Sequence, residues 1–186
     1  GATGTIDLGG GVFDLTATSA NTARIQQISV SVGAVTIDSV RPEVSARGDT
    51  QAHLGGTFVI TAGAVNVRAD APAHLATTET FALDIGAVNF GLTAFPVLLD
   101  HGTEAFVADD ADVTIVGGPL TLAATAGGEA LVESLNIDIG LVNVGIASSE
   151  ARVDGRTRSY LGTGARLTAE DVSFSATSTG HTARSR

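Results

Sequence analysis

The stretch VFDLTATSANTA at residues 12–23 recurs in altered form three more times along the chain. The later copies are AVNVRADAPAHLA at 64–76, PLTLAATAGGEAL at 119–131 and DVSFSATSTGHTA at 171–183. Aligned on Phe13, Val65, Leu120 and Val172, successive copies are 52, 55 and 52 residues apart. A recurrence at this period is typical of proteins that stack one structural unit on copies of itself.

Two further landmarks follow the first in the same order in each copy. The second is GAVTI at residues 33–37, GAVNF at 86–90 and GLVNV at 140–144. The third is GDTQAHL at 48–54, GTEAFV at 102–107 and GRTRSYL at 155–161, where we expect a glycine turn that leads into a strand. These landmarks divide the chain into repeat 1 (11–62), repeat 2 (63–117), repeat 3 (118–170) and the start of repeat 4 (171–186).

Within each repeat the apolar residues alternate with polar or small ones. Ile28, Val30 and Val32 alternate with serines, and residues 135–139 (LNIDI) show the same period of two. This period predicts half-buried strands, and we expect an interior of Ala, Val, Leu and Ile because aromatic residues make up only 4% of the chain. No segment shows a helical stripe.

The fold class that we predict is all-β, a β-solenoid of stacked repeats of about 53 residues with parallel strand pairing between repeats. Each repeat could instead contain two smaller coils, since GAVNV at residues 63–67 resembles GAVNF at 86–90. The alternative architecture is a string of small antiparallel β-sandwiches. It is less favoured because so short a unit with few aromatic residues makes a marginal core of its own.

Composition excludes several kinds of function. The 186 residues include no Cys, so disulfides, thiolate metal sites and cysteine nucleophiles are absent. The 20 acidic residues outnumber the 10 basic ones, all of them Arg, and the net charge of −10 argues against nucleic acid as a partner. No run approaches the roughly 20 apolar residues of a membrane span. Because the chain lacks Met, we expect an internal piece of a longer protein or a processed product.

The stretch SYLGTGARLTAEDVSFSATSTGHTA at residues 159–183 resembles the repeats of giant bacterial surface proteins, the large adhesin and filamentous-haemagglutinin-like class. Those repeats read as an aromatic-Ile/Leu-Gly turn, a Gly-Ala, an alternating strand and a Val-x-Val-x-Ala-Thr-Ser strand. The positions that fall on this pattern are Tyr160, Leu161, Gly162, Gly164, Ala165, Leu167, Ala169, Val172, Phe174, Ala176 and Thr177. Earlier repeats match less closely.

This resemblance implies a long β-solenoid stalk on the outside of a bacterial cell. It implies a role in adhesion, matrix formation or fibre assembly, and it carries over no catalytic residues. The partner it implies is the chain itself as stacked repeats. We also expect that protomers join as an end-to-end filament, since the chain breaks off within a repeat after Thr177. A glycan or a host surface is the alternative partner.

The tripeptide Arg47-Gly48-Asp49 reads as an integrin-binding motif. Gly48, however, lies at the third landmark together with Gly102 and Gly155, so the fold accounts for the glycine. Arg47 and Asp49 are then ordinary solvated neighbours, and we favour this interpretation.

Acidic residues gather in the last part of the second repeat and form the best candidate cation site. They are Asp100, Glu104, Asp109, Asp110 and Asp112. Calcium is bound by several oxygen ligands on a flexible loop, but this spacing matches neither the EF-hand loop nor the glycine-rich nonapeptide of calcium β-rolls. We favour a solvated edge that opposes aggregation, so calcium is the one cofactor to be considered.

The histidines show no metal-binding spacing, and zinc is disfavoured. His53 aligns with Phe106 and Tyr160, so we expect it to occupy an aromatic position in a stack along the repeats. Phe106 and Tyr160 are also the candidate rings for a sugar-binding face. Their row is short, whereas sugar-binding faces present several rings.

We find no catalytic motif such as Gly-x-Ser-x-Gly or a phosphate-binding loop, and we predict that the chain is not an enzyme. The function that we predict is that of a structural segment in an extracellular bacterial fibre or adhesin stalk. The alternative is a glycan- or cell-binding face of a surface adhesin.

Overall fold

The computed structural model describes residues 2–186 and is all-β, with no helix in that range. Fourteen strands form three sheets. The end sheet contains β1 (Thr3–Asp7), β6 (Thr57–Thr61), β9 (Asp112–Val116) and β12 (Arg166–Thr168). The β7 sheet contains β2 (Val12–Thr18), β3 (Thr22–Val32), β7 (Ala64–Ile85), β10 (Leu120–Ile139), β13 (Val172–Ser178) and β14 (Thr182–Ser185). The β8 sheet contains β4 (Val35–Val40), β5 (Val44–Leu54), β8 (Val88–Val107) and β11 (Val142–Leu161).

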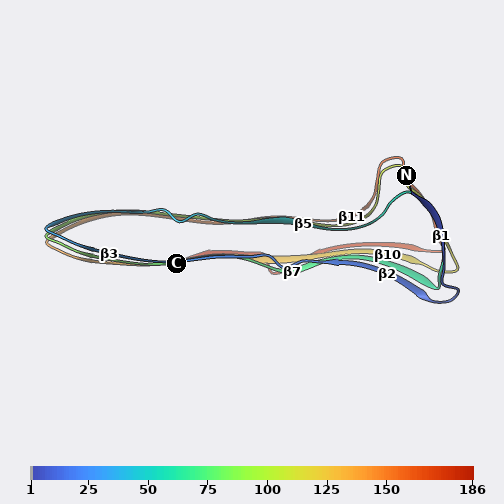
Figure 1. The fold of residues 1–186 in the computed structure, drawn as a ribbon, viewed down its shortest axis with the longest axis horizontal. Helices are drawn as coiled ribbons and strands as arrows, with labels where there is room; N and C mark the ends of the chain where they lie inside the picture. The colour runs from blue at the N-terminus through green and yellow to red at the C-terminus, as the bar shows by residue number, and fades with distance from the viewer. Residues whose placement is uncertain (1) are drawn as a thin grey trace.

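In each repeat the chain passes in turn through the end sheet, the β7 sheet and the β8 sheet. Figure 1 shows the β7 and β8 sheets as two long layers that meet at a tight bend, with the end sheet closing the opposite end. The repeats overlie one another in this view, which looks down the shortest axis of the molecule. Successive repeats are therefore displaced along that axis.

Every strand pairing is parallel and joins residues between 52 and 55 positions apart. Phe13 lies opposite Val65, Val65 opposite Leu120, and Leu120 opposite Val172, as the first landmark predicts. The antiparallel sandwich alternative is therefore wrong. The division into two smaller coils is wrong as well, because residues 64–67 lie in β7 and residues 88–90 in β8, which belong to different sheets.

The apolar core lies where the three sheets meet and continues between the two long layers. Val65 and Val67 of β7, Val113 of β9 and Leu122 of β10 are fully buried in the first part. Phe95 of β8 is the largest buried side chain, in a second cluster between the β7 and β8 sheets. These small aliphatic side chains fill a layer about 10 Å thick, the usual separation of stacked sheets.

Apolar and polar residues exchange sides near the bend, although the inward and outward alternation of side chains continues. In β3 the side chains of Ala23 and Ile25 face inward. Beyond Gln26 the inward position is taken by Ser29, and Ile28 is 78% exposed. The same change follows Glu79 in β7 and Glu133 in β10. The expectation of an apolar interior is therefore wrong for this end of the molecule, where the apolar residues face outward.

Candidate functional site

The integrin-type tripeptide lies inside a strand. Arg47, Gly48 and Asp49 are consecutive residues of β5 and lie opposite Asp100, His101 and Gly102 of β8. The glycine turn expected here is therefore wrong, and the same holds for Gly102 and Gly155, which lie within β8 and β11. A Cβ atom at Gly48 would lie 2.6 Å from Nδ2 of Asn21, so the Asn21 side chain would have to shift.

The five acidic candidates do not form one site. Among residues 2–186, no group of three or more His, Asp or Glu residues is placed to hold a metal ion. Asp109 and Asp110 lie in the turn before β9, where Oδ1 of Asp109 accepts the backbone N–H of Thr163 at 2.7 Å. Asp110 has a φ of 56°, in the left-handed region that asparagine and aspartate tolerate in turns.

The other three candidates lie in strands. Asp112 and Asp100 are exposed in β9 and β8. Glu104 is buried, and Nη2 of Arg156 lies 2.9 Å from its Oε1. The ion pair and the turn contact of Asp109 both join the second repeat to the third, so these acidic groups have structural partners.

The aromatic stack predicted from the sequence is confirmed. The ring centroids of His53 and Phe106 are 5.0 Å apart, and those of Phe106 and Tyr160 are also 5.0 Å apart, with interplanar angles of 11° and 3°. Burial raises the pKa of Tyr160, and the carboxylate of Glu104, to which the Tyr160 hydroxyl donates at 3.4 Å, raises it further. Since the rings stack on one another, both faces of Phe106 are covered and are not available to a sugar.

Three histidines meet between the two long layers, which the sequence analysis missed. The ring centroids of His74 and His101 are 4.7 Å apart, and those of His101 and His181 are 5.1 Å apart. His74 and His101 are 2% and 3% exposed. Alignment of the first landmark places His74 and His181 at equivalent positions, together with Asn21. This alignment could have predicted that the two histidines of the β7 sheet lie close together, but it does not include His101.

The buried histidines are held as neutral rings. The backbone N–H of Asn21 donates to Nδ1 of His74 at 3.0 Å, so the proton of a neutral His74 resides on Nε2. Burial lowers the pKa of His74, and the positive charge of His181 lowers it further. Burial also lowers the pKa of His101, as do His74 and His181, against a smaller opposing effect of Asp100 and Asp49.

Acidification is therefore expected to destabilise the protein. Well above pH 6.5, His74 and His101 are neutral in both the folded and the unfolded protein. Below pH 6.5 these histidines bind protons in the unfolded chain, whereas in the folded protein they stay neutral until the pH reaches their lower pKa values. The free energy of unfolding should fall by up to about 1.4 kcal/mol per pH unit for each histidine. Chemical denaturation at a series of pH values between about 7 and about 5.5 measures this slope.

A matched pair of variants assigns the slope to the cluster. His101→Asn should flatten it, whereas His53→Asn, at an exposed position, should leave it unchanged. Asp84 acts in the opposite sense, because its raised pKa makes protonation favour the folded state. An unchanged slope in His101→Asn would rule out His101 as a contributor to it.

Carboxylates also line a partly open cavity of about 220 Å³ near the bend. Asp38, Asp84 and Asp138 come from the first, second and third repeats, and Asp84 is only 5% exposed. Burial raises the pKa of Asp84, followed by the negative charges of Asp38 and Asp138. The Ser29 hydroxyl donates to Asp38 at 2.8 Å. Polar groups therefore occupy the interior of this end.

A ladder of polar side chains also runs between repeats near the bend. The Thr36 hydroxyl donates to Oδ1 of Asn89 at 2.6 Å, and Nδ2 of Asn89 donates to Oδ1 of Asn143 at 2.8 Å. Thr36 and Asn89 are 4% and 2% exposed. The ladder satisfies amide groups that would otherwise be costly to bury.

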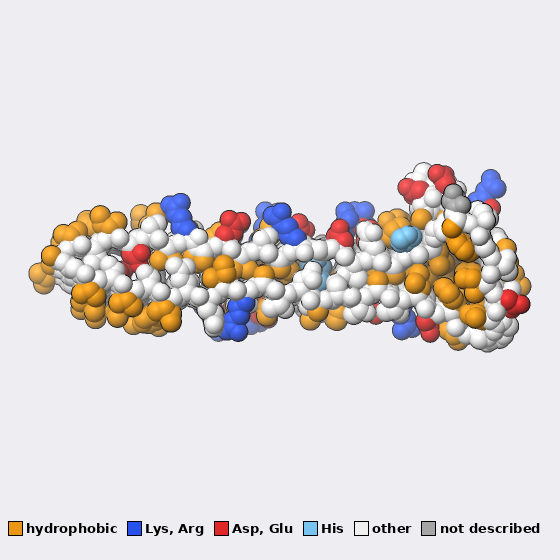
Figure 2. Space-filling model, viewed as in Figure 1, with side chains coloured by type: hydrophobic (Ala, Val, Ile, Leu, Met, Phe, Trp, Pro, Cys, Tyr) orange, Lys and Arg blue, Asp and Glu red, His pale blue; other side chains and the backbone are white. Residues whose placement is uncertain are grey.

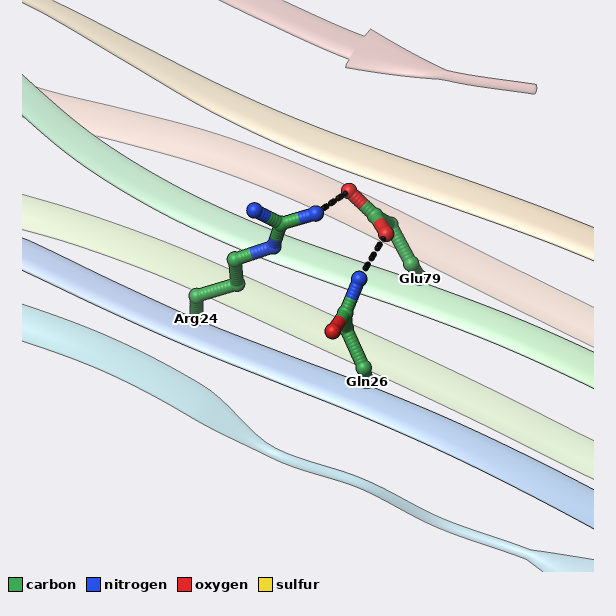
Figure 3. A network of polar contacts seen from close by, with 3 residues as sticks. All are labelled: Arg24, Gln26 and Glu79. Carbon is green, nitrogen blue, oxygen red and sulfur yellow. Dashed lines mark hydrogen bonds and ion pairs between the residues drawn. The ribbon is translucent and has the colours of Figure 1, made fainter.

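A second network lies on the outer surface of the β7 sheet, just before the point where apolar and polar residues exchange sides. Figure 3 shows Arg24 and Gln26 of β3 reaching Glu79 of β7, at 2.5 and 2.6 Å. The hydrogen bond from Arg24 has the larger effect and that from Gln26 the smaller, and both lower the pKa of the Glu79 carboxyl group. The network joins the first repeat to the second. Because it is exposed to solvent, its contribution to the free energy of unfolding is the small one of a surface ion pair.

Comparison of the chain with protein-family models, with curated proteins and with solved structures returns no match. Residues 2–186 contain no helix long and apolar enough to cross a membrane.

Proposed function

We propose that the chain is a segment of a β-solenoid whose function is structural, as part of an extracellular bacterial fibre or adhesin stalk. The observation that carries this proposal is the parallel pairing of all three sheets at a spacing of 52 to 55 residues. Each backbone ladder then runs along the stacking axis, so hydrogen bonds resist extension of the stalk.

Side-chain contacts along the same axis support this proposal. The stack of His53, Phe106 and Tyr160 and the ladder of Thr36, Asn89 and Asn143 both join equivalent positions of successive repeats. The net charge of −10 supplies an acidic coat that limits unspecific clumping.

Single-molecule stretching between the two ends of the chain tests the mechanical role. Repeats that contact only their neighbours should be released one after another, each release adding about 19 nm of contour length for about 53 residues at about 3.6 Å each. Extension without resistance beyond that of an unfolded chain would contradict the proposal. A glycan-array signal that is lost in Tyr160→Ala would instead favour a binding face.

A further inference from the structure

The end of the molecule at the bend carries an apolar outer surface on both long layers. We call it the apolar fin and define it as residues 28–37, 81–92 and 135–146. Figure 2 shows hydrophobic side chains gathered over this end, while Arg and Lys side chains are absent from its tip. The large apolar residues exposed there are Ile28, Val30, Val32, Val35, Ile37, Ile85, Phe90, Leu135, Ile137, Ile139, Leu141, Val142, Val144 and Ile146.

Exposure of the fin is not confined to the outermost strands. In the second repeat, which has a neighbour on either side, Phe90 is 45% exposed and Ile85 is 37% exposed. Leu141, at the bend of the third repeat, is 91% exposed. The apolar surface thus covers the β7 sheet, the bend and the β8 sheet in succession.

The arrangement recurs although the repeats differ in sequence. Polar or small residues face inward in all three, among them Ser29, Asp84 and Asn136. Burial of the Asp84 carboxyl group costs free energy, and so does exposure of the apolar side chains of Ile28 and Ile37 to water. The same inversion in three repeats indicates that the outer surface of the fin is normally covered.

The dimensions of the fin restrict what can cover it. Each face is three strands wide, with about 4.8 Å between strands, and about six residues long, with about 3.3 Å per residue, which gives an area of about 300 Å². A standard interface buries about 800 Å² on each partner. One face is therefore too small for a tight closed dimer. The two faces together provide about twice that area.

A lipid bilayer is the other occupant that an apolar surface of this kind would suit. Flotation with vesicles, described below, distinguishes it from a second copy of the chain.

The charge distribution favours a second copy of this chain. The only charged side chains in the fin are Asp84 and Asp138, and both lie on the inward side of their strands. The rest of the molecule carries the net charge of −10, so electrostatic repulsion opposes contact between two copies outside their fins. Flat apolar sheet faces can then pack about 10 Å apart.

We propose that copies of this chain associate laterally by packing their apolar fins face to face. Because both faces of each fin are apolar, a molecule takes a partner on either side and the assembly does not close at a dimer. This contact differs from end-to-end stacking of repeats, and it does not depend on the mechanical role proposed above.

Sedimentation equilibrium of the 186-residue chain, up to millimolar concentration, tests the proposal. The weight-average mass should rise past that of a dimer. Ile28→Glu blocks the β7-sheet face and Ile146→Glu blocks the β8-sheet face, so each should stop association at the dimer, and the double variant should stay monomeric. These side chains are 78% and 64% exposed, so the fold should persist, as circular dichroism will report.

Val12→Glu is the matched control, since Val12 is 55% exposed on β2 outside the fin and the charge change is the same. It should associate as the unmodified chain does. The proposal is overturned if the unmodified chain remains monomeric throughout, or if it associates equally well with both fin faces charged, which would point to edge-strand pairing. Flotation with phosphatidylcholine vesicles by a chain that does not self-associate would assign the fin to lipid and equally overturn it.

Discussion

Replacement of Phe95 by alanine should lower the free energy of unfolding by about 3–5 kcal/mol, the range observed for buried phenylalanines. Phe95 is 1% exposed and packs against Val97 and Leu99 between the two long layers. Phe90 lies on the same strand but is 45% exposed on the outer surface. Phe90→Ala is therefore expected to cost less than about 1 kcal/mol.

Urea denaturation followed by circular dichroism measures both variants under one set of conditions. The comparison is informative because both residues are phenylalanines of β8 and lie on opposite sides of the strand. Equal losses, or a larger loss for Phe90→Ala, would mean that β8 does not reverse its apolar side between these positions.

This reversal was beyond reach from the sequence for a definite physical reason. Alternation with a period of two shows that Ile28, Val30 and Val32 share one side of a strand, but it does not say which side faces the opposing layer. That choice depends on residues across the layer, here the polar side chains of Asp38 and Asn89. The two adjacent glutamines at 26 and 27, where the apolar phase shifts, are the local signal.

A methyl group added at Gly86 should destabilise the protein by about 3 kcal/mol, the upper end of the usual cost of overpacking. A Cβ atom at Gly86 would lie 2.5 Å from the carbonyl oxygen of Gly33 in the first repeat and 2.6 Å from Oδ1 of Asn89. The first of these atoms belongs to the backbone of the neighbouring bend, so relief requires the two repeats to move apart.

Gly91→Ala is the matched control for Gly86→Ala. Gly91 lies inside β8, and a Cβ atom there would meet nothing within 4 Å. Alanine should raise the stability by about 0.5–1 kcal/mol, since glycine weakens a strand interior. Thermal and urea unfolding of the two variants checks the contrast, and a loss in Gly91→Ala as large as that in Gly86→Ala would contradict close contact between the bends.

The repeats themselves could be predicted because equivalent positions lie next to one another. Phe13, Val65, Leu120 and Val172 occur in register, and so do the rings of His53, Phe106 and Tyr160. A residue in such a column has its own counterpart as a neighbour, so similarity along the chain reports contact in space.

Contacts across the thin interior could not be predicted in this way. His74 and His101 come from different landmarks and meet only because the β7 and β8 sheets face each other at that level. The glycines at 48, 102 and 155 were misplaced for a related reason. Glycine signals a turn in isolation, but here it leaves room for large side chains, with Gly48 beside Asn21 and Gly155 beside His181 and His101.

Disulfide formation between engineered cysteines tests the stacking of the repeats most directly, and the chain has no cysteine of its own to interfere. Thr16 and Arg68 are exposed and lie in register on β2 and β7, with their Cα atoms about 4.8 Å apart, within the range that a disulfide spans. Asp70 lies two residues out of register with Thr16, at about 8 Å, beyond that range.

Mild oxidation at low protein concentration should therefore link the pair Thr16→Cys and Arg68→Cys within one chain. The pair Thr16→Cys and Asp70→Cys should remain reduced under the same conditions. Mass spectrometry of the digested protein identifies the bond. Linkage of the second pair in place of the first, or linkage only between separate chains, would contradict parallel stacking at this register.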